Sequence, residues 1–238
     1  MVPAHLGRID YGRAEIVIGV TSRAEIMSRL RPSAKEPWTV RWIEESVRSG
    51  DVLYDVGANV GSYTLIAAAQ PAENLRVVAV EPGYASYAAL CDNVALNGFE
   101  STVTPLPVVL SDRTGLADLA YRNVEPGAAE HQLQRGASAA YHQPVLSFRL
   151  DDLVSKIGLP APTLLKIDVD GAEVPVLAGA PLTLASTDLR SVLVEVRRDL
   201  TNEVVRLLEE AGLAVRARVE ERNGQPLHDV WYGIFERG

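Results

Sequence analysis

The chain has 238 residues, a formal net charge of −8 at pH 7 and 47% hydrophobic residues. This length suits one domain with a sizeable buried core, and the composition excludes disordered, collagen-like and coiled-coil proteins. The acidic balance argues against a nucleic-acid partner, because phosphate binding depends on basic patches. The single cysteine, Cys91, excludes an internal disulfide framework.

The amino-terminal segment does not read as a signal peptide, because charged residues interrupt its first ten positions. No run of the chain approaches the roughly 20 apolar residues that span a bilayer. The sequence therefore predicts a cytoplasmic protein without membrane insertion.

The elements alternate between strands and helices over most of the chain. Residues 1–50 are expected to form an N-terminal helical cap region, because apolar residues in 38–47 recur at helical spacing. After them, short buried strands alternate with helices, which is typical of a parallel sheet covered on both faces. The expected strands are 51–56, 75–80, 103–110, 163–169 and 191–196, and the helices are 62–70, 84–96, 151–156, 172–178 and 201–211.

Two segments depart from the alternation. Residues 113–150 are expected to form a hairpin-like excursion over the active site, with strands near 115–122 and 144–150. Near the C-terminus, strands at 214–220 and 229–236 flank Asn-Gly, a strong turn signal. We therefore predict a single α/β domain over residues 1–238, with a doubly wound, mostly parallel sheet and an antiparallel C-terminal hairpin.

The turn after the first strand indicates a bound ligand. There a strand leads through Gly57, Asn59 and Gly61 into a helix, at the edge where doubly wound sheets bind ligands. The glycines permit a tight turn and close approach of the backbone, and asparagine tolerates a left-handed conformation. The spacing fits neither the dinucleotide fingerprint Gly-x-Gly-x-x-Gly nor a nucleotide-triphosphate loop.

Acids at the strand ends indicate which ligand this turn would bind. Asp55, before the glycines, suits an ammonium group and would repel a pyrophosphate. Glu81 ends the second strand, where a carboxylate can accept hydrogen bonds from two ribose hydroxyls. An ammonium acceptor, a ribose acceptor and no phosphate cradle together describe S-adenosylmethionine. Ser111 and Asp112, after the third strand, are expected beside its adenine.

Two motifs in the expected order carry a family resemblance. They are Asp55-Val56-Gly57-Ala58-Asn59-Val60-Gly61 with Val80-Glu81-Pro82, and Leu165-Lys166-Ile167-Asp168-Val169-Asp170-Gly171-Ala172-Glu173. With them, residues 36–198 resemble the FkbM family of methyltransferases. Asp170 departs from the pattern, because the family more often has glutamate there. The resemblance implies a class I, Rossmann-like methyltransferase fold.

The same resemblance implies an activity. It is S-adenosylmethionine-dependent methylation, typically O-methylation, with S-adenosylhomocysteine as the other product. Family members are associated with sugar hydroxyls, glycolipids and natural-product biosynthesis, so a small-molecule or glycan acceptor is expected here.

Carboxylates at the ends of the fourth and fifth strands are candidates for the chemistry. Methyl transfer is an in-line displacement, and an alcohol acceptor benefits from a general base that takes its proton. Asp168 is the first candidate, followed by Glu195 and Asp170. The alternative for Asp168 is to position the cofactor or a loop without proton transfer. These acids could also bind magnesium or calcium, but no metal site is predicted.

Several other residues carry weaker signals. His131 and His142, in the excursion, are alternative bases, although a lone loop histidine is more often solvated. Trp38 and Trp42 are expected to pack on the sheet, and Lys166 to pair with a neighbouring acid.

The donor motifs leave other functions open. They are compatible with methylation of an amine or another nucleophile, with an RNA methyltransferase, which the charge disfavours, and with a non-catalytic protein that keeps the donor fold. A nicotinamide oxidoreductase is disfavoured by the missing dinucleotide fingerprint. The sequence predicts neither an individual acceptor nor an oligomeric state.

Overall fold

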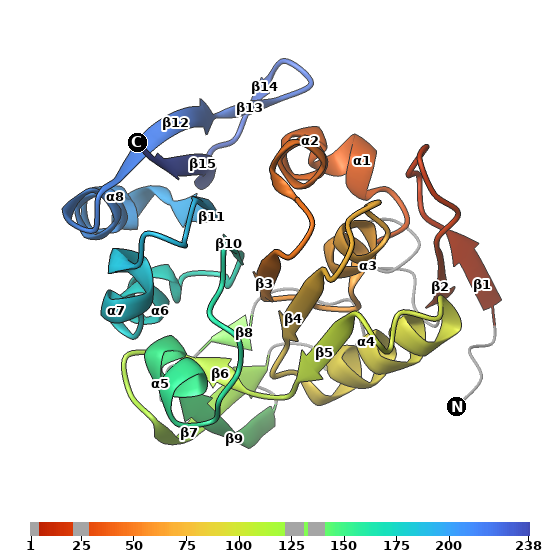
Figure 1. Cartoon of the computed structure of the whole chain (residues 1–238), viewed down its shortest axis with the longest axis horizontal. Helices are drawn as coiled ribbons and strands as arrows, with labels where there is room; N and C mark the ends of the chain where they lie inside the picture. Colours follow the sequence, from red (N-terminus) through yellow and green to blue (C-terminus); the bar gives the residue numbers. More distant parts are fainter. Residues whose placement is uncertain (1–4, 21–28, 122–130, 133–140) are drawn as a thin grey trace.

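The computed structural model describes residues 5–20, 29–121, 131–132 and 141–238, and a seven-stranded sheet forms its centre. The strand order is β12-β15-β11-β10-β3-β4-β5, with β15 antiparallel to both of its neighbours and the other pairs parallel (Figure 1). The strands are β3 (Val52–Val56), β4 (Arg76–Val80), β5 (Val103–Leu106), β10 (Leu164–Ile167), β11 (Ser191–Arg197), β12 (Leu213–Val219) and β15 (Val230–Arg237). The expected doubly wound sheet and its antiparallel C-terminal hairpin are therefore confirmed.

Helices cover both faces of this sheet. One face packs under α2 (Pro37–Ser46), α3 (Ser62–Ala68) and α4 (Tyr84–Leu96). The opposite face packs under helices that Figure 1 shows in green to blue: α5 (Leu150–Ser155), α6 (Glu173–Ala178), α7 (Pro181–Ala185) and α8 (Thr201–Glu210). Alternate residues of β3 enter the two cores, Leu53 one and Tyr54 the other, because successive strand side chains point to opposite faces.

One expected strand, 103–110, is two strands in different sheets. After β5, Pro107 has no N–H to donate to a ladder, and the chain leaves the central sheet there. The next strand, β6 (Val109–Leu110), pairs with β9 (Tyr141–Phe148) of a small second sheet. In that sheet β9 is antiparallel to β7 (Gly115–Tyr121), which confirms the predicted hairpin, and β8 (His131–Gln132) pairs with the far end of β7.

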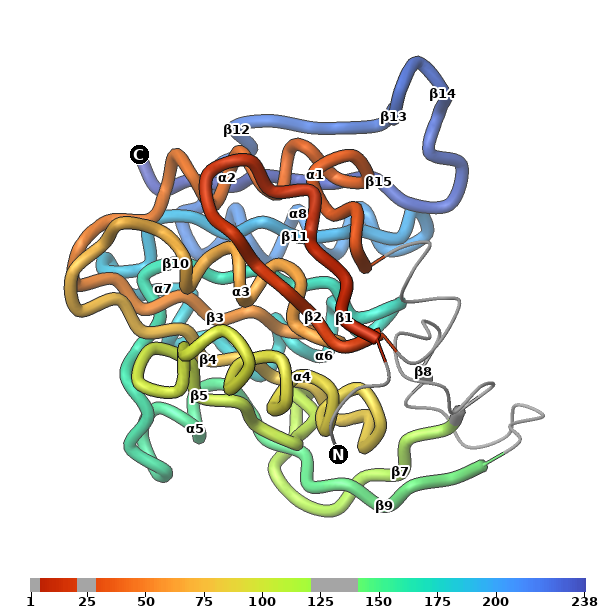
Figure 2. Tube along the Cα trace, turned by 90° about the vertical axis from the view of Figure 1, so that its right-hand side faces the viewer, coloured from red at the N-terminus to blue at the C-terminus, as the bar shows by residue number. Residues whose placement is uncertain are grey.

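The N-terminal region differs from the predicted helical cap. Its described part begins with a hairpin of β1 (His5–Arg8) and β2 (Val17–Val20), and only then come α1 (Pro32–Lys35) and α2. Asparagines of α4 hold β2 in place: Asn93 Oδ1 accepts the Gly19 N–H at 2.7 Å and Asn97 Oδ1 the Val17 N–H at 3.0 Å. Figure 2 shows this hairpin, in red, on the side formed by α2–α4. The residue pattern of this segment does not predict the hairpin, because the contacts that hold β2 come from α4, which lies far along the chain.

The C-terminal hairpin extends beyond the sheet. Past β12 and β15, the short strands β13 (Glu221–Arg222) and β14 (Gln225–Pro226) pair around Asn223 and Gly224. Both turn residues have positive φ, 52° and 73°, as a two-residue hairpin turn requires. Within the described ranges, no helix is long and apolar enough to cross a membrane.

Gly57 occupies a position where no other residue fits. Its φ is 81°, and a Cβ atom there would lie 1.8 Å from the Asp168 carbonyl oxygen. Gly57→Ala should lower the free energy of unfolding by about 2–5 kcal/mol, from left-handed strain plus backbone overlap. Urea unfolding measures this loss.

Gly50→Ala is the matched control, because Gly50 has φ 83° and no atom within 4 Å of the place that a Cβ atom would take. It should lose about 1–2 kcal/mol, from strain alone. Equal losses in the two variants would contradict the importance of the Gly57 contact.

Candidate active site

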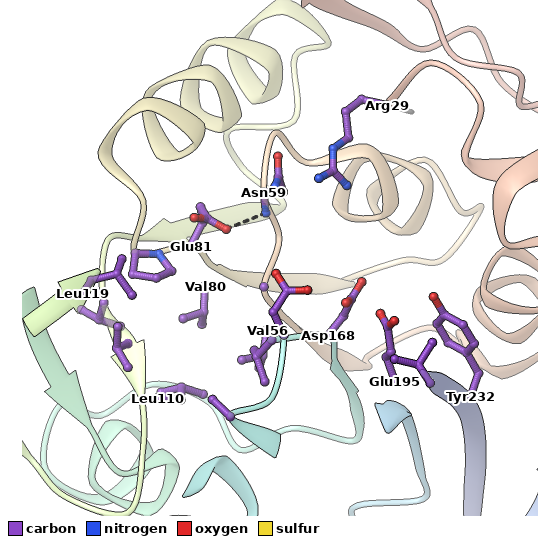
Figure 3. Close-up of a pocket in the computed structure, with 18 of the residues that line it drawn as sticks. Arg29, Val56, Asn59, Val80, Glu81, Leu110, Leu119, Asp168, Glu195 and Tyr232 are labelled. Carbon is purple, nitrogen blue, oxygen red and sulfur yellow. Dashed lines mark hydrogen bonds between the residues drawn. The ribbon is translucent and has the colours of Figure 1, made fainter. Parts of the chain in front are cut away.

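A cavity of about 360 Å³ lies at the carboxyl ends of the parallel strands. The strand order reverses between β3 and β10, so the loops that follow these strands diverge and leave a crevice there. The lining residues labelled in Figure 3 come from both sides of this point: Arg29, Val56, Asn59, Val80, Glu81, Leu110, Leu119, Asp168, Glu195 and Tyr232.

One end of the cavity is a cradle around Glu81. The Glu81 carboxylate accepts the backbone N–H of Asn59 at 2.8 Å and that of Gly83 at 2.8 Å, and its side chain reaches into the cavity (Figure 3). The turn that brings Asn59 here has positive φ at Gly57, Asn59 and Gly61. The structure thus brings Gly57, Asn59 and Glu81 together at the cavity, as predicted from the strand ends.

Burial raises the pKa of Glu81 to about 7, although its hydrogen bonds with Gly83 and Asn59 act in the opposite direction. Near neutral pH this carboxyl group is therefore divided between its two protonation states. A ligand that donates hydrogen bonds to Glu81 favours the ionised form.

Apolar side chains form the wall beside this cradle. They are Val80, Val108, Val109, Leu110 and Leu119. Leu119 belongs to β7, so the 113–150 excursion contributes to the cavity wall through that residue. This combination of an apolar slot and a carboxylate acceptor suits a flat ring attached to a ribose.

Asp168 and Glu195 form a hydrogen-bonded carboxyl pair at the other end. Burial favours the neutral form of each group, but the charge of Lys166 and the hydrogen bond with Glu195 hold the pKa of Asp168 well below its usual range. Burial, together with the charge of Asp168, raises the pKa of Glu195 to about 10. At neutral pH the pair therefore shares one proton, which resides on Glu195.

Asp55 is not part of the cavity lining. Its side chain is 1% exposed, and its two oxygens accept hydrogen bonds from Lys166 Nζ at 2.9 Å and from Thr64 Oγ1 at 2.6 Å. The structure thus places the predicted ammonium acceptor behind the cavity wall, paired with a lysine. The predicted pairing of Lys166 with a neighbouring acid is present.

Three other predicted cofactor contacts also lie off the lining. Gly61 is the N-cap residue of α3, and a Cβ atom on it would lie 2.6 Å from Leu90, so this glycine serves helix packing. Ser111 and Asp112 hydrogen-bond to each other at 3.0 Å on the surface, whereas the preceding residue, Leu110, lines the cavity. The expected strand 103–110 ends in the second sheet, at β6, and Ser111 and Asp112 lie just beyond the lining residue Leu110.

Several lining residues did not emerge from the sequence. Tyr232 lies beside Glu195 because the two are paired in the register of β11 and β15, which the hairpin prediction alone did not specify. Burial, followed by the charges of Glu36, Glu195 and Asp168, raises the pKa of Tyr232. Arg29, Lys35 and Arg222 also line the cavity, and no motif surrounds them in the sequence.

The alternative bases and the tryptophans lie elsewhere. His142 pairs with Asp118 at 3.1 Å on β7–β9, outside the cavity, and the His131 side chain is not among the described ones. Trp42 donates a hydrogen bond to Ser191 Oγ at 2.9 Å, and the rings of Trp38 and Tyr232 lie 4.9 Å apart, so both tryptophans pack as expected.

The acids considered as possible metal ligands, Asp168, Asp170 and Glu195, all line the cavity. Among the described side chains, no group of three or more His, Cys, Asp or Glu residues could hold a metal ion.

Known proteins resemble this chain in sequence and in fold. The model of the methyltransferase FkbM domain matches residues 55–214. Hexuronic acid methyltransferase AglP of Haloferax volcanii is 29% identical, and the match covers 83% of this chain and 80% of that protein. The 31-O-demethyl-FK506 methyltransferase FkbM of Streptomyces tacrolimicus is 30% identical, over 77% of this chain and 81% of its own.

A solved structure supports the fold. The precorrin-6y C5,15-methyltransferase from Geobacter metallireducens superimposes with a TM-score of 0.52 at 16% identity, over 85% of this chain and 88% of that one. The class I methyltransferase fold is confirmed, and S-adenosylmethionine is the methyl donor of such enzymes. By its sequence and its fold, the chain belongs to the FkbM family of S-adenosylmethionine-dependent methyltransferases.

Proposed function

We propose that this enzyme methylates a hydroxyl group of a sugar, glycolipid or other natural product, with Asp168 as the general base. The observation that carries the proposal is the Asp168–Glu195 pair, which faces the same cavity as the Glu81 cradle. The names of the two sequence relatives point to a hexuronic acid and to an O-demethylated natural product as their acceptors.

The donor fits the cradle end. The Glu81 carboxylate, already oriented by two backbone N–H groups, has lone pairs left for ribose hydroxyls. Gly57 brings the backbone close to the ligand, and the apolar slot beside Val80 and Leu110 accommodates the purine. S-adenosylmethionine supplies an electrophilic methyl group on a positively charged sulfur. Because Asp55 is withdrawn behind the wall, acids that line the cavity, such as Asp170, are better placed for the donor's ammonium group.

The acceptor fits the opposite end. There Tyr232 is the register partner of Glu195, and Leu227 and Val230 of the C-terminal hairpin also line the cavity. An aromatic and apolar wall beside the carboxyl pair suits a ring that bears hydroxyls, because the ring can pack on the wall while one hydroxyl donates a hydrogen bond to the ionised Asp168.

The protein then performs three tasks. It aligns the acceptor oxygen with the methyl carbon, which supplies the larger part of the acceleration. Asp168 accepts the hydroxyl proton as the carbon–oxygen bond forms and the carbon–sulfur bond breaks. Glu195, protonated at neutral pH, donates its hydrogen bond to Asp168 and keeps that carboxylate oriented.

Glu81→Gln should weaken binding of S-adenosylhomocysteine by about 1–3 kcal/mol, because the amide removes a charged acceptor and sets an N–H₂ against a backbone N–H. Since the pKa of Glu81 is about 7, wild-type affinity should fall as the pH is lowered through 7, and the Gln variant should lose that dependence. Calorimetric titration measures both.

The matched control is Asp112→Ala, because Asp112 is an exposed acid that hydrogen-bonds to Ser111 and is not part of the cavity lining. Its affinity should stay within about twofold of the wild type. A large loss of affinity in Asp112→Ala, with none in Glu81→Gln, would contradict the role of Glu81 and indicate that Asp112 binds the donor.

Asp168→Asn should lower kcat by about 10²–10⁴-fold, because an amide accepts no proton. Donor affinity, measured in parallel with S-adenosylhomocysteine, should change far less. A parallel loss of both would make Asp168 a positioning residue, and unchanged turnover would remove it from the chemistry.

A labelled-methyl assay tests the acceptor class. Incubation with hexuronic acids, neutral sugars, macrocyclic alcohols and amino sugars should give labelled products in which the label survives mild alkali, as a methyl ether does and a carboxyl ester does not. Alkali-labile label would indicate esterification of a carboxylate, and label on nitrogen would favour the amine alternative.

A further inference from the structure

We propose that Lys166 is a positioning residue that holds Asp168 ionised, and that Asp55 is the counter-charge of this lysine instead of a ligand of the donor. The proposal rests on the proposed function only insofar as Asp168 is the base. The positions of the three side chains are independent of that role.

The sheet places the three side chains in one row. Lys166 lies on β10, and Asp168 follows two residues later, just beyond the end of the strand. Their side chains therefore point to the same face of the sheet. In the parallel register of β3 and β10, Asp55 is the direct partner of Lys166. The Lys166 Nζ atom lies 2.9 Å from Asp55 Oδ1 and 3.5 Å from Asp168 Oδ2, so one ammonium group bridges both carboxylates.

Exposure separates the two carboxylates. The side chains of Asp55 and Lys166 are 1% and 2% exposed, whereas that of Asp168 is 22% exposed and lines the cavity. A ligand in the cavity therefore reaches Asp168 and not the other two. Both Asp55 oxygens already accept hydrogen bonds, from Lys166 and from Thr64.

The remaining charged neighbours do not replace this ammonium. From the loop before α2, Glu36 adds negative charge near Lys166, and from α3 the Tyr63 ring lies 5.3 Å from the ammonium. Glu195 on β11 carries the shared proton, and Tyr232 on β15 stays neutral, because burial and the nearby acids raise its pKa.

Two further cations act on Asp168 from the cavity side. Lys35 and Arg29 both lower the pKa of Asp168, but they follow Lys166 and the Glu195 hydrogen bond in strength. Lys35 also forms an ion pair with Glu36 at 2.7 Å. Lys166 is therefore the buried cation on which the ionised state of Asp168 chiefly depends.

The consequence concerns where the proton of the carboxyl pair resides. Two carboxyl groups in contact share a proton, and a fixed cation next to one of them localises the negative charge there. With Lys166 beside Asp168, the proton stays on Glu195 and the carboxylate that faces the acceptor is free to accept another. Without the cation, burial would drive Asp168 toward its neutral form, which cannot serve as a base.

The test uses two variants and a readout that requires neither donor nor acceptor. Lys166→Met alone would leave Asp55 as an unpaired buried charge, so it is combined with Asp55→Asn, and the single Asp55→Asn variant, which keeps the cation, is the matched control. The carboxyl carbon of Asp168, assigned by its loss in Asp168→Asn, is titrated by NMR in ¹³C-aspartate-labelled protein. Circular dichroism at each pH verifies the fold.

We expect the wild-type Asp168 to stay ionised down to the lowest pH at which the protein remains folded. In the double variant its pKa should rise by about 2 units or more, since an opposite charge within hydrogen-bonding range accounts for shifts of about 1–3 units and burial then acts unopposed. In the Asp55→Asn control the pKa should not rise. The acidic limb of the kcat profile should move in the same direction as the NMR titration.

The control variant also tests the second half of the proposal, and it does so even if the double variant fails to fold. Asp55→Asn should bind S-adenosylhomocysteine within about threefold of the wild type, whereas an acid that binds the donor's ammonium would lose about tenfold or more. An unchanged titration of Asp168 in the folded double variant, or a tenfold loss of affinity in the control, would overturn the proposal. Full turnover in Asp168→Asn would instead overturn the base assignment and leave the titration result standing.

Discussion

The active end of this fold depends on one close contact between backbones. The turn after β3 passes so near the Asp168 carbonyl oxygen that only glycine, with φ 81°, can occupy position 57. At this switch point the chain must bring the cradle strands β3 and β4 next to the strands β10 and β11 that bear the carboxyl pair. A side chain at position 57 would push these two halves apart, and the cavity would lose the spacing between Glu81 and Asp168.

The two buried charges behind the cavity wall, those of Lys166 and Asp55, cancel each other, and the strand register fixes their positions. Burying an isolated ion costs several kcal/mol, so Lys166 and Asp55 are tolerable together where neither would be alone. The same pair gives the cavity wall a fixed electric field that no mobile solvent ion provides. Glu81 achieves its orientation differently, because two backbone N–H groups, and not a buried lysine, hold its carboxylate. The carboxylate at each end of the cavity is thus held in a different way, Glu81 by backbone N–H groups and Asp168 by the lysine.

The parallel strands of the core can be predicted from the sequence because the signals that mark them are local. The strands and the position of Glu81 can be predicted from short stretches of sequence. The signals are buried apolar runs such as Val77–Val80, glycines at a tight turn and acids at strand ends. Asp55 shows where such reasoning fails, since its partner Lys166 is 111 residues away and lies beside it only through strand register. The β1–β2 hairpin and the position of Tyr232 also depend on distant pairings that periodicity does not report. Pro107 interrupts the pattern of the expected strand 103–110, but the sequence alone does not predict that the chain enters a second sheet after it.

The C-terminal hairpin has a consequence for how such enzymes diversify. It joins the sheet at one edge only, through the pairing of β15 with β11, and its far turn at Asn223–Gly224 projects beyond the sheet (Figure 1). Arg222 and Leu227 come from this extension and Val230 from the adjoining end of β15, while the cradle around Glu81 comes from strands on the other side of β10. Insertions, deletions or new side chains near that turn alter one wall of the cavity and leave the strands beneath the opposite wall untouched. Under the proposed assignments, changes near this turn would alter the acceptor end of the cavity while the donor end stays constant.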